Sequence, residues 1–530
     1  MVEYLNKSSG FNQFAKNYSS RQSGSRRSPG VGFFPRFIIW TALIFLIWTW
    51  LMPSDNAQQA AQPTVETDRQ LDLSEVPTMR IGSDVMDFQL QGVRISDISL
   101  RNFQEEKKSN RSVRLLGGDR EFIEIGIFAA GSTAPTAQTR WDGVSFADDS
   151  ENVNSMLWRG DNADFGRYIA VNDYVITVTD RIANTGNEPL RIVQYARIIR
   201  AGGERTQFGI RTGAISFVND RIKTETWRNL ARRAPIFQTM DAAFSGFTDQ
   251  YWQTIVAQDT SNKTIRIRQR SDEFFQTEIS PDWITVAPGE THEFVTNIFA
   301  GPKTQTALAN AEQIIPGIDR TIDYGWFGIL SRPMLWTLEK IHGVIPNWGI
   351  AIIFLTLIIR GLMWPLTRKS FLAMQAMQKI HPELKRIQKT YAHDKVRMQQ
   401  EIMMLYRTKK ANPFAGIGLM ILQIPIFFAL YKALLVAVPL RHAEFLWIRD
   451  LSAMDGLLIM PVLMALTMWL QQRFTMSKNI DAPGAQVIKY LPFILAGVFA
   501  WMPAGLVLYW TTSNVAGIFQ LWIMKKREQK

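Results

Sequence analysis

The chain has 530 residues, carries a net charge of +12 at pH 7 and contains no cysteine. This length predicts more than one structural unit, and the positive charge favours nucleic acid or anionic lipid as a partner. The lack of cysteine excludes thiol chemistry, iron–sulfur clusters and cysteine-ligated zinc. The five histidines show no metal-ligand spacing, and there is no glycine-rich phosphate loop. We therefore expect a protein that is not an enzyme and has no cofactor and no metal site.

The N-terminal segment predicts a membrane anchor. Residues 1–34 form a basic tail, and residues 35–52 form an apolar run that includes FIIWTALIFLIWTWLM. No Lys or Arg follows this run until Arg69, so the positive-inside rule places the N-terminus in the cytoplasm. A cleaved signal peptide is the alternative. The run is longer than a usual signal core and has no clean A-x-A at its end, which favours an uncleaved first transmembrane helix.

Residues 53–325 follow the anchor and are expected outside the cytoplasm. Apolar and polar residues alternate with a period of two in several segments, and glycine- and asparagine-rich turns such as ANTGNE separate them. This pattern predicts a mostly antiparallel all-β domain, a sandwich or something larger. We find no pair of carboxylates or nucleophile arrangement in it, so a scaffold or docking role is favoured. The alternating segments lie at 87–95, 174–179, 264–269 and 292–299.

Residues 326–346 predict an amphipathic helix on the outer membrane surface. Pro333 suits a first helical turn, with Ser331 as its cap, and apolar residues recur at helical spacing after it. Trp326 and Trp336 favour the lipid–water boundary. A helix packed on the outer domain is the alternative.

Five further apolar runs predict membrane spans, which gives six in all. Between Pro365 and Pro413 the chain has eleven Lys or Arg and three acids, so this segment is expected in the cytoplasm. Residues 490–524 have no charge and are too long for one span, and WMPAG at 501–505 divides them. Both termini are then cytoplasmic. The five spans are 347–366, 412–438, 456–472, 488–503 and 505–524, with a short basic tail at 525–530.

The basic segment 367–411 predicts a cytoplasmic helical hairpin with a break near AHD at 392–394 and a kink or division at Pro382. Methionine suits surfaces that receive varied apolar partners, although packing of one arm on the other explains much of the pattern. The basic face suits anionic lipids or ribosomal RNA, without a specific nucleic-acid sequence. The methionines that could receive such partners are Met374, Met377, Met398, Met403 and Met404.

One arginine, Arg360, lies well inside a predicted span. It is eight residues, or about 12 Å of helix, from the basic boundary at Arg368. Arginine near a span centre costs roughly 2.5–3.5 kcal/mol, and the six spans contain no Asp or Glu to neutralise it. We therefore expect Arg360 to face a hydrated cavity that opens to the cytoplasm. Lys432, a second cation well inside a predicted span, is expected to reach outward to the surface.

Uncharged polar and aromatic residues of several spans are expected to line the same cavity. A cationic, hydrated hollow would lower the cost of moving acidic or polar segments partway across the bilayer, which is what a membrane protein insertase requires. Thr356, Arg360 and Trp364 share one face of the second span at i, i+4 and i+8. The expected groove residues are Arg360, Thr356, Trp364, Gln423, Tyr509, Trp510, Thr512, Ser513 and Gln520.

The stretch DYGWFGILSRPMLWTLEKIHGVIPNWG at 323–349 and the large domain after the first span resemble the Gram-negative branch of the YidC/Oxa/Alb family of membrane protein insertases. Several further motifs resemble those of the family as a whole. They are IIRGLMWPLTRKS, ANPFAGIGLMILQIPIFFALYKALL, LWIRDLSAMD and WMPAGLVLYWTTSNVAGIFQ. The resemblance is strong over about 323–524 and weaker over the outer domain. It implies an α-helical polytopic protein of the cell inner membrane, with a five-helix core, a periplasmic β-supersandwich and a cationic groove.

By this resemblance Arg360 is the groove arginine, and Thr356 and Trp510 meet the client helix. Trp510 stands where the family often has tyrosine, and Lys432 departs from a usual apolar residue. The implied partners are nascent membrane proteins, the Sec translocon, the ribosome and the signal recognition pathway.

Other functional classes remain open at this point. A secondary transporter or channel would also place a charge at membrane depth, but it would usually show internal repeats and coupling carboxylates, and neither is visible. An assembly factor acting through the outer domain alone would leave Arg360 unexplained. An organelle transit peptide is a further interpretation of the acid-poor start, and the large domain after the first span favours a bacterial protein.

Overall fold

A computed structural model describes residues 73–107, 109–117, 120–145, 153–203, 210–232, 236–240, 242–260, 262–271, 273–409, 415–475 and 485–528. The predicted basic tail and first transmembrane helix, 1–34 and 35–52, lie outside the described residues. The described residues divide into two units, of which the first contains 485–494 and the second contains those from 73 to 475 and from 495 to 528. Every contact given below lies within the second unit.

Residues 78–302 form two large antiparallel sheets. The ten-stranded sheet has the order β1-β2-β3-β5-β10-β17-β16-β13, with β4 paired to β3 and β18 to β10. Its strands are β1 Thr78–Gly82, β2 Met86–Gln91, β3 Arg94–Gln104, β4 Ser112–Leu116, β5 Phe122–Ala130, β10 Leu190–Ala201, β13 Ile236–Met240, β16 Lys263–Gln269, β17 Phe274–Pro281 and β18 Ile284–Val286.

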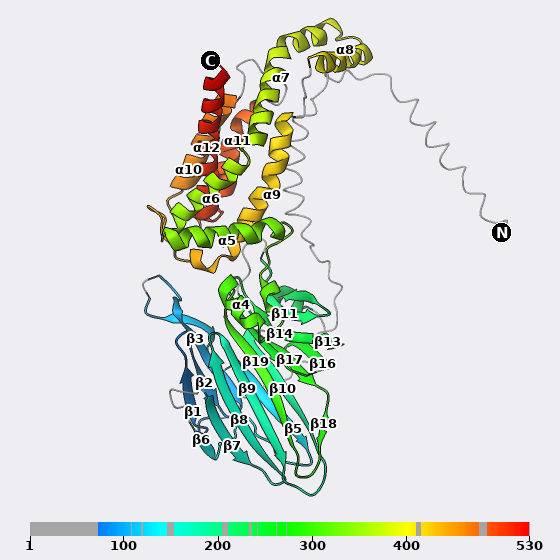
Figure 1. The fold of residues 1–530 in the computed structure, drawn as a ribbon, viewed down its shortest axis with the longest axis vertical. Helices are drawn as coiled ribbons and strands as arrows, with labels where there is room; N and C mark the ends of the chain where they lie inside the picture. Colours follow the sequence, from blue (N-terminus) through cyan, green and yellow to red (C-terminus); the bar gives the residue numbers. More distant parts are fainter. Residues whose placement is uncertain are drawn as a thin grey trace, which may run out of the picture. The chain divides into compact units, whose positions relative to one another are not determined.

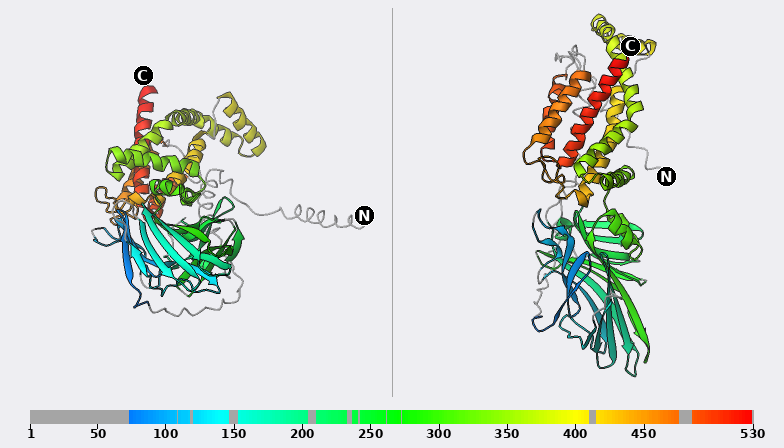
Figure 2. Two further views of the ribbon diagram at one scale, coloured as in Figure 1. Left: turned by 60° about the horizontal axis from the view of Figure 1, so that its bottom comes forward. Right: turned by 60° about the vertical axis from the view of Figure 1, so that its left-hand side comes forward.

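The nine-stranded sheet has the order β12-β11-β14-β15-β19-β9-β8-β7-β6. The views in Figures 1 and 2 show its long strands β8, β9 and β19 side by side. Its strands are β6 Gly143–Ser145, β7 Val153–Arg159, β8 Ala163–Asn172, β9 Val175–Asn184, β11 Gly213–Val218, β12 Arg221–Thr226, β14 Ala242–Thr248, β15 Trp252–Gln258 and β19 Thr291–Pro302.

The two sheets share one apolar core, so the predicted β sandwich is confirmed. Ile95 and Ile198 from the ten-stranded sheet are buried in the same cluster as Ile176 and Ile298 from the nine-stranded sheet. Alternate residues of a strand point to opposite faces, and this is why the period-two pattern marked these segments correctly.

One predicted segment, 87–95, is a hairpin rather than a single strand. It contains the end of β2, a turn at Gly92 and the start of β3. Gly92 has φ +58°, and a Cβ there would lie 2.3 Å from the carbonyl oxygen of Ala137. Glycine supplies both the left-handed backbone and the close approach that this turn requires.

Short helices accompany the sheets and lead toward the C-terminal helices. Thr304 caps α4 by accepting from the backbone N–H of Ala307 at 3.2 Å. These elements are α3 Trp227–Leu230, α4 Gln305–Glu312 and the 3₁₀ helix η1 Ile318–Thr321.

Helix α5, Gly328–Val344, begins earlier than the expected cap at Ser331. Gly325, with φ +69°, turns the chain so that the helix starts after Phe327. The Ser331 hydroxyl donates to the carbonyl oxygen of Phe327 at 3.1 Å. Ser331 therefore lies inside the first turns, and Pro333 follows it within the helix.

The apolar segment predicted as one span at 347–366 is broken near its end. Helix α6 covers Trp348–Leu362, and α7, Trp364–Thr390, follows at an angle of 59°. Pro365 has no N–H to donate to Gly361, and its ring clashes with that carbonyl, so a straight helix cannot continue here. Pro382, by contrast, does not divide α7.

The remaining helices follow in chain order, and α12 packs against both α6 and α10. The chain turns at residues 391–394, near the predicted break, between α7 and α8. It turns again at 500–503, where WMPAG interrupts the last apolar run. The elements are α8 Lys395–Thr408, α9 Ala415–Val436, η2 Val438–Leu440, α10 Ile459–Thr475, α11 Ala485–Phe499 and α12 Ala504–Glu528.

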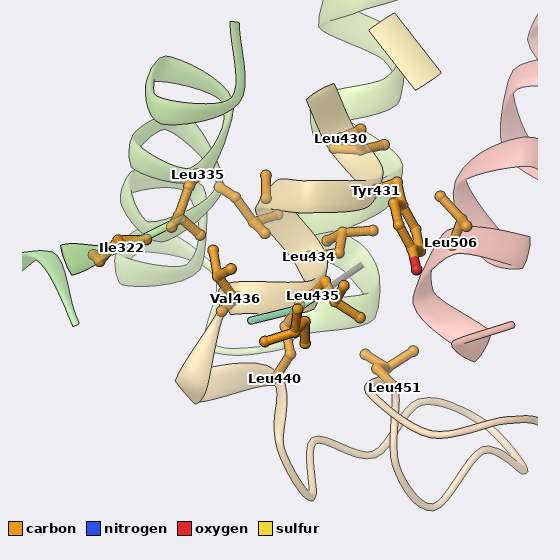
Figure 3. Packing of buried hydrophobic residues seen from close by; sticks show 14 of the residues in the cluster. Ile322, Leu335, Leu430, Tyr431, Leu434, Leu435, Val436, Leu440, Leu451 and Leu506 are labelled. Carbon is orange, nitrogen blue, oxygen red and sulfur yellow. The ribbon is translucent and has the colours of Figure 1, made fainter. Parts of the chain in front are cut away.

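The C-terminal end of α9 lies at the centre of the helical core. In Figure 3, Leu430, Leu434 and Leu435 lie between Leu335 of α5 and Leu506 of α12. The same cluster includes Leu440 and Leu451 from the loop between α9 and α10. This packing fixes α5, α6, α9 and α12 as one framework.

Among the described helices, none taken singly has the length and apolar character required to cross a membrane. The bent pair α6 and α7 meets both requirements when its two helices are taken together.

Candidate functional site

Arg360 lies near the C-terminal end of α6 and is 9% exposed. Its Nε donates to the Ser513 hydroxyl on α12, with 2.7 Å between the two atoms. Within the part of the chain that the structure describes, no carboxylate oxygen lies within 4 Å of its guanidinium nitrogens. The arginine is therefore buried against a neutral hydrogen-bond acceptor and not in an ion pair.

Helix α12 presents a polar stripe to Arg360. Tyr509, Ser513, Gly517 and Gln520 are spaced four, four and three residues apart and so share one helical face. Gln520 Nε2 donates to the carbonyl oxygen of Arg360 at 3.1 Å. That carbonyl is among the last four of α6, which lack helical partners at a helix end. Gln520 therefore caps the end of the helix that carries the arginine.

Gly517 and Gln471 belong to this site, although the sequence did not single them out. A Cβ on Gly517 would lie 2.8 Å from Gln471 Nε2 and 3.7 Å from Arg360 Nη1. The absence of a side chain lets α6 and α10 bring these two groups close to α12. The available signal was a glycine within an apolar helix, which often marks a close approach between helices.

Gln423 and Tyr509 extend the polar stripe to α9. Gln423 Nε2 donates to the Tyr509 hydroxyl at 3.0 Å. Asn514, which also faces inward, donates to the Thr467 hydroxyl of α10 at 3.2 Å. Polar side chains of α9, α10 and α12 thus lie near the end of α6 that carries the arginine. Those named here are uncharged hydrogen-bond donors and acceptors.

Thr356 lies one turn before Arg360 and is fully buried. Its hydroxyl donates to the carbonyl oxygen of Ile352 at 2.7 Å within the same helix. Trp364 does not continue this face, because it is the first residue of α7, beyond the bend. The expected alignment of Thr356, Arg360 and Trp364 on one straight helix is therefore wrong.

Trp510 and Thr512 lie on other faces of α12. The Trp510 ring packs against Phe427 at a centroid distance of 5.1 Å and against Phe499 at 5.0 Å, both edge-on. Trp510 and Thr512 are both partly exposed. Trp510 thus belongs to an aromatic cluster between α9, α11 and α12, outside the polar stripe.

The five methionines expected to act together lie in different environments. Met374 packs beside Phe371 and Leu521, where α7 meets α12. Met377 packs beside Ile380 and Leu405, where α7 meets α8. Met398 is partly buried, whereas Met403 and Met404 on α8 are 55% and 58% exposed. Only the last two combine an apolar side chain with a largely exposed surface.

Lys432 of α9 ends in an ion pair. Its Nζ lies 2.9 Å from an Oδ of Asp323, a residue 109 positions earlier in the chain. The carboxylate lies outside every predicted span, so an inventory of charges within the spans could not find it.

These features describe a protein with a large β sandwich followed by apolar helices that enclose one arginine among neutral polar groups. The C-terminal residues 340–530 match the family model described as 60Kd inner membrane protein, and residues 78–337 match the one described as YidC periplasmic domain. The curated protein "Membrane protein insertase YidC" from Rickettsia bellii is 31% identical over 520 residues, which cover 90% of this chain and 92% of that protein. The chain belongs to the YidC family of membrane protein insertases.

Two further matches agree with that assignment in name. A protein of the same name from Jannaschia sp. is 30% identical over 530 residues, covering 86% of this chain and 84% of that protein. The solved structure described as active YidC insertase with the first transmembrane domain resolved is 16% identical, with a TM-score of 0.36. It covers 93% of this chain and 99% of that one. Because that score is low, the family assignment rests on the sequence matches.

Proposed function

We propose that this chain inserts proteins into the inner membrane of a Gram-negative bacterium and helps them fold, alone or with the Sec translocon. The observation that carries this proposal is the buried, carboxylate-free environment of Arg360. A permanent cation held by neutral groups keeps its attraction for an incoming acidic or polar segment. A cation already neutralised by a carboxylate would not.

An acidic side chain of a client segment can lie either in hydrocarbon or beside a hydrated cation, and its free energy differs between these two environments. Placing an acidic side chain at membrane depth costs several kcal/mol in hydrocarbon. A cation at the same depth, reached by water from the cytoplasm, offsets part of that cost through attraction in a low-dielectric setting. A transporter would instead need coupling carboxylates near this position, and none lies within 4 Å of Arg360 among the described residues. The proposed groove residues are Arg360, Thr356, Gln423, Tyr509, Trp510, Thr512, Ser513 and Gln520.

Exposed apolar side chains support a membrane setting for the helices. On α6, Phe354, Leu357 and Ile358 are 45–47% exposed. On α12, Val515 and Phe519 are 52% and 59% exposed. Continuous apolar surface of this kind is costly in water and favourable in lipid. We propose six spans with both termini in the cytoplasm, and α7 with α8 as a cytoplasmic hairpin.

The hairpin is the part proposed to meet clients and cytoplasmic partners first. Met403 and Met404 present flexible apolar side chains on α8, next to cations such as Arg407. The same basic surface suits anionic lipid headgroups and the ribosome, and the signal recognition pathway is a further proposed partner. This proposal limits client contact in the hairpin to the two exposed methionines, because Met374 and Met377 pack internally.

The test replaces the arginine in a strain depleted of its own insertase. Arg360→Ala is expected to impair insertion of a client with an acidic outside segment, while Arg360→Lys retains much of the activity because it keeps the charge. Arg368→Ala, which removes an exposed cation from α7, serves as the matched control. Normal insertion of the acidic client by Arg360→Ala would remove the basis of the proposal.

Contact with the client is tested separately by photo-crosslinking to a stalled nascent membrane protein. Probes at Thr512 and Trp510, which are partly exposed, are expected to crosslink. A probe at Leu440, which is buried and remote in the sequence from the polar stripe, is expected not to. Equal crosslinking from all three positions would contradict a defined groove.

A further inference from the structure

A second cationic site lies away from Arg360, between the β domain and the C-terminal end of α9. It is a cavity of about 350 Å³, within the range of about 300–1,000 Å³ typical of small-molecule sites. Residues around Ile210, Thr224 and Lys303 line it from the β domain, and Lys432 lines it from α9. We call it the Lys303 pocket.

The charges that line this pocket are unbalanced. Among the residues that the structure describes, four cationic residues and a single carboxylate, Asp323, contribute to the wall. One of the four, Arg320, is paired at 2.6 Å with Asp220, which is not part of the lining. That carboxylate is already paired with Lys432 at 2.9 Å. The cationic residues are Arg211, Lys303, Arg320 and Lys432.

Lys303 is the most deeply buried of these cations. It is 5% exposed, and its Nζ donates to the Thr248 hydroxyl at 3.1 Å. An ammonium carries three N–H donors, and the hydroxyl uses one of them. The nearby Asp249 is held by Arg200 at 2.9 Å, so it is occupied elsewhere. A buried cation with donors to spare, at the wall of a cavity, is the arrangement that binds an anion.

Part of the pocket lining is apolar, which restricts the kind of anion. We call Ile210, Ile215, Ile222 and Val436 the apolar wall. Gly325, which also lines the pocket, lies three residues before α5, the predicted helix of the outer membrane surface. An anion with an attached apolar part would contact both the cationic residues and the apolar wall. The position of the pocket near the outer membrane surface rests on the proposed topology.

We propose that the Lys303 pocket binds a phosphate-bearing anion, with the phosphoryl oxygens accepting from Lys303 and Arg211 and with the apolar wall receiving an attached chain. The headgroup of an anionic phospholipid and free inorganic phosphate share this chemistry. The site is distinct from the Arg360 groove and shares no residue with it.

Because Lys303 can lose its proton, the pH dependence of anion affinity gives a second test of binding at this pocket. Burial lowers the pKa of Lys303 to about 8, although Asp249 and Asp323 oppose this effect and Lys432 adds to it. Arg211 and Arg320 also face the pocket. An anion prefers the protonated lysine, so its affinity falls as the pH rises through about 8.

The experiment measures binding to the full-length protein in detergent by isothermal titration calorimetry. The probes are dioctanoyl-phosphatidylglycerol, inorganic phosphate and dioctanoylglycerol, which has no phosphate. Lys303→Met is expected to weaken binding of the phosphate-bearing probes by about tenfold or more, because it removes a hydrogen bond from a charged group. Arg211→Gln, at an exposed position that does not threaten folding, is expected to weaken binding less.

The matched control is Lys223→Met, which removes the same charge from β12. Residues 222 and 224 line the pocket, so the side chain of Lys223 points to the opposite face of the strand. The Lys223→Met variant is expected to bind the phosphate-bearing probes as tightly as the wild type does.

The arms of this experiment separate the two sources of the anion. Tighter binding of the lipid than of inorganic phosphate, with loss in Lys303→Met, identifies a lipid headgroup. Equal Lys303-dependent binding of both identifies a free anion. Unchanged binding in both Lys303→Met and Arg211→Gln, or equal binding of dioctanoylglycerol, overturns the proposal. The assay does not depend on insertion activity, so it stands apart from a failure of the proposed function.

Discussion

Two buried arginines, one in the β domain and one among the helices, have opposite environments. Arg167 is 2% exposed and forms two hydrogen bonds with Asp180, at 2.7 and 2.8 Å, and a third with the carbonyl oxygen of Ile125. Gln194 donates to the same carboxylate. Arg360 is buried nearly as deeply but meets a hydroxyl group instead of a carboxylate. The first arginine is neutralised by its carboxylate partner, whereas the second has a hydroxyl partner and no carboxylate partner among the described residues.

Of the substitutions considered, one at Arg167 is expected to change the free energy of unfolding most. Arg167→Met leaves Asp180 buried without its cation, and breaking a buried pair in this way lowers the free energy of unfolding by about 3–5 kcal/mol. Chemical denaturation of the intact protein in detergent measures it. Arg114→Met, which breaks an exposed pair with Asp97, is the control and is expected to change stability by less than about 1 kcal/mol. Similar values for the two variants would show that the Arg167 pair does not stabilise the domain.

Lys303 provides an intermediate case, because it is buried with one hydroxyl partner but can lose its proton. Its pKa of about 8 in the folded protein lies below the ordinary value of 10.5. The unfolded chain therefore binds more protons between these two pH values, and stability rises with pH in that window. Between pH 8 and about pH 9.5 the gain is about 2 kcal/mol.

The measurement is the free energy of unfolding as a function of pH for the wild type minus that for Lys303→Met. The difference between the two proteins isolates this lysine from other titrating groups. A flat difference across the window would show that Lys303 retains an ordinary pKa.

Arg360→Met is expected to change stability by less than about 1 kcal/mol, or to raise it. The substitution loses a hydrogen bond from a charged group, worth about 1.5–3 kcal/mol, and removes a cation whose burial costs about 2.5–3.5 kcal/mol. Thermal unfolding in detergent measures this, beside the insertion assay. A loss of several kcal/mol would place Arg360 in the same structural class as Arg167.

The smallest effect is expected from Gly517→Ala. Alanine favours the helix over glycine, so stability is retained. The added Cβ displaces the Gln471 amide, which lies 2.8 Å away, and presses toward Arg360. Moving side chains off their preferred rotamers costs about 0.5–1.5 kcal/mol, which corresponds to a roughly two- to tenfold loss of insertion. Gly497→Ala, where a Cβ would meet nothing within 4 Å, is the control. Equal insertion by the two variants would contradict the role of Gly517.

Sequence patterns predicted the parts of the molecule that depend on local periodicity. Alternation in segments such as 174–179 indicated strands, and the inventory of charges in the spans selected Arg360 without any structure. The bend after Leu362 was also available in principle, since Pro365 lies in the predicted span.

Contacts between distant residues were not predictable in this way. The carboxylate for Lys432 comes from Asp323, outside the spans, so the charges within the spans could not predict this ion pair. Nothing in the local sequence distinguishes Arg167 from the other arginines of the domain, because its partner Asp180 is selected by strand pairing. Gly517 likewise acquires its role only through the approach of α6 and α10.

The capped end of α6 has a mechanical consequence. Pro365 removes one rung of backbone hydrogen bonding at the joint with α7, and Gln520 fastens the Arg360 carbonyl to α12 just before it. A change in the angle between α6 and α7 at this joint would therefore leave the last turn of α6, and the guanidinium that it carries, in place against α12.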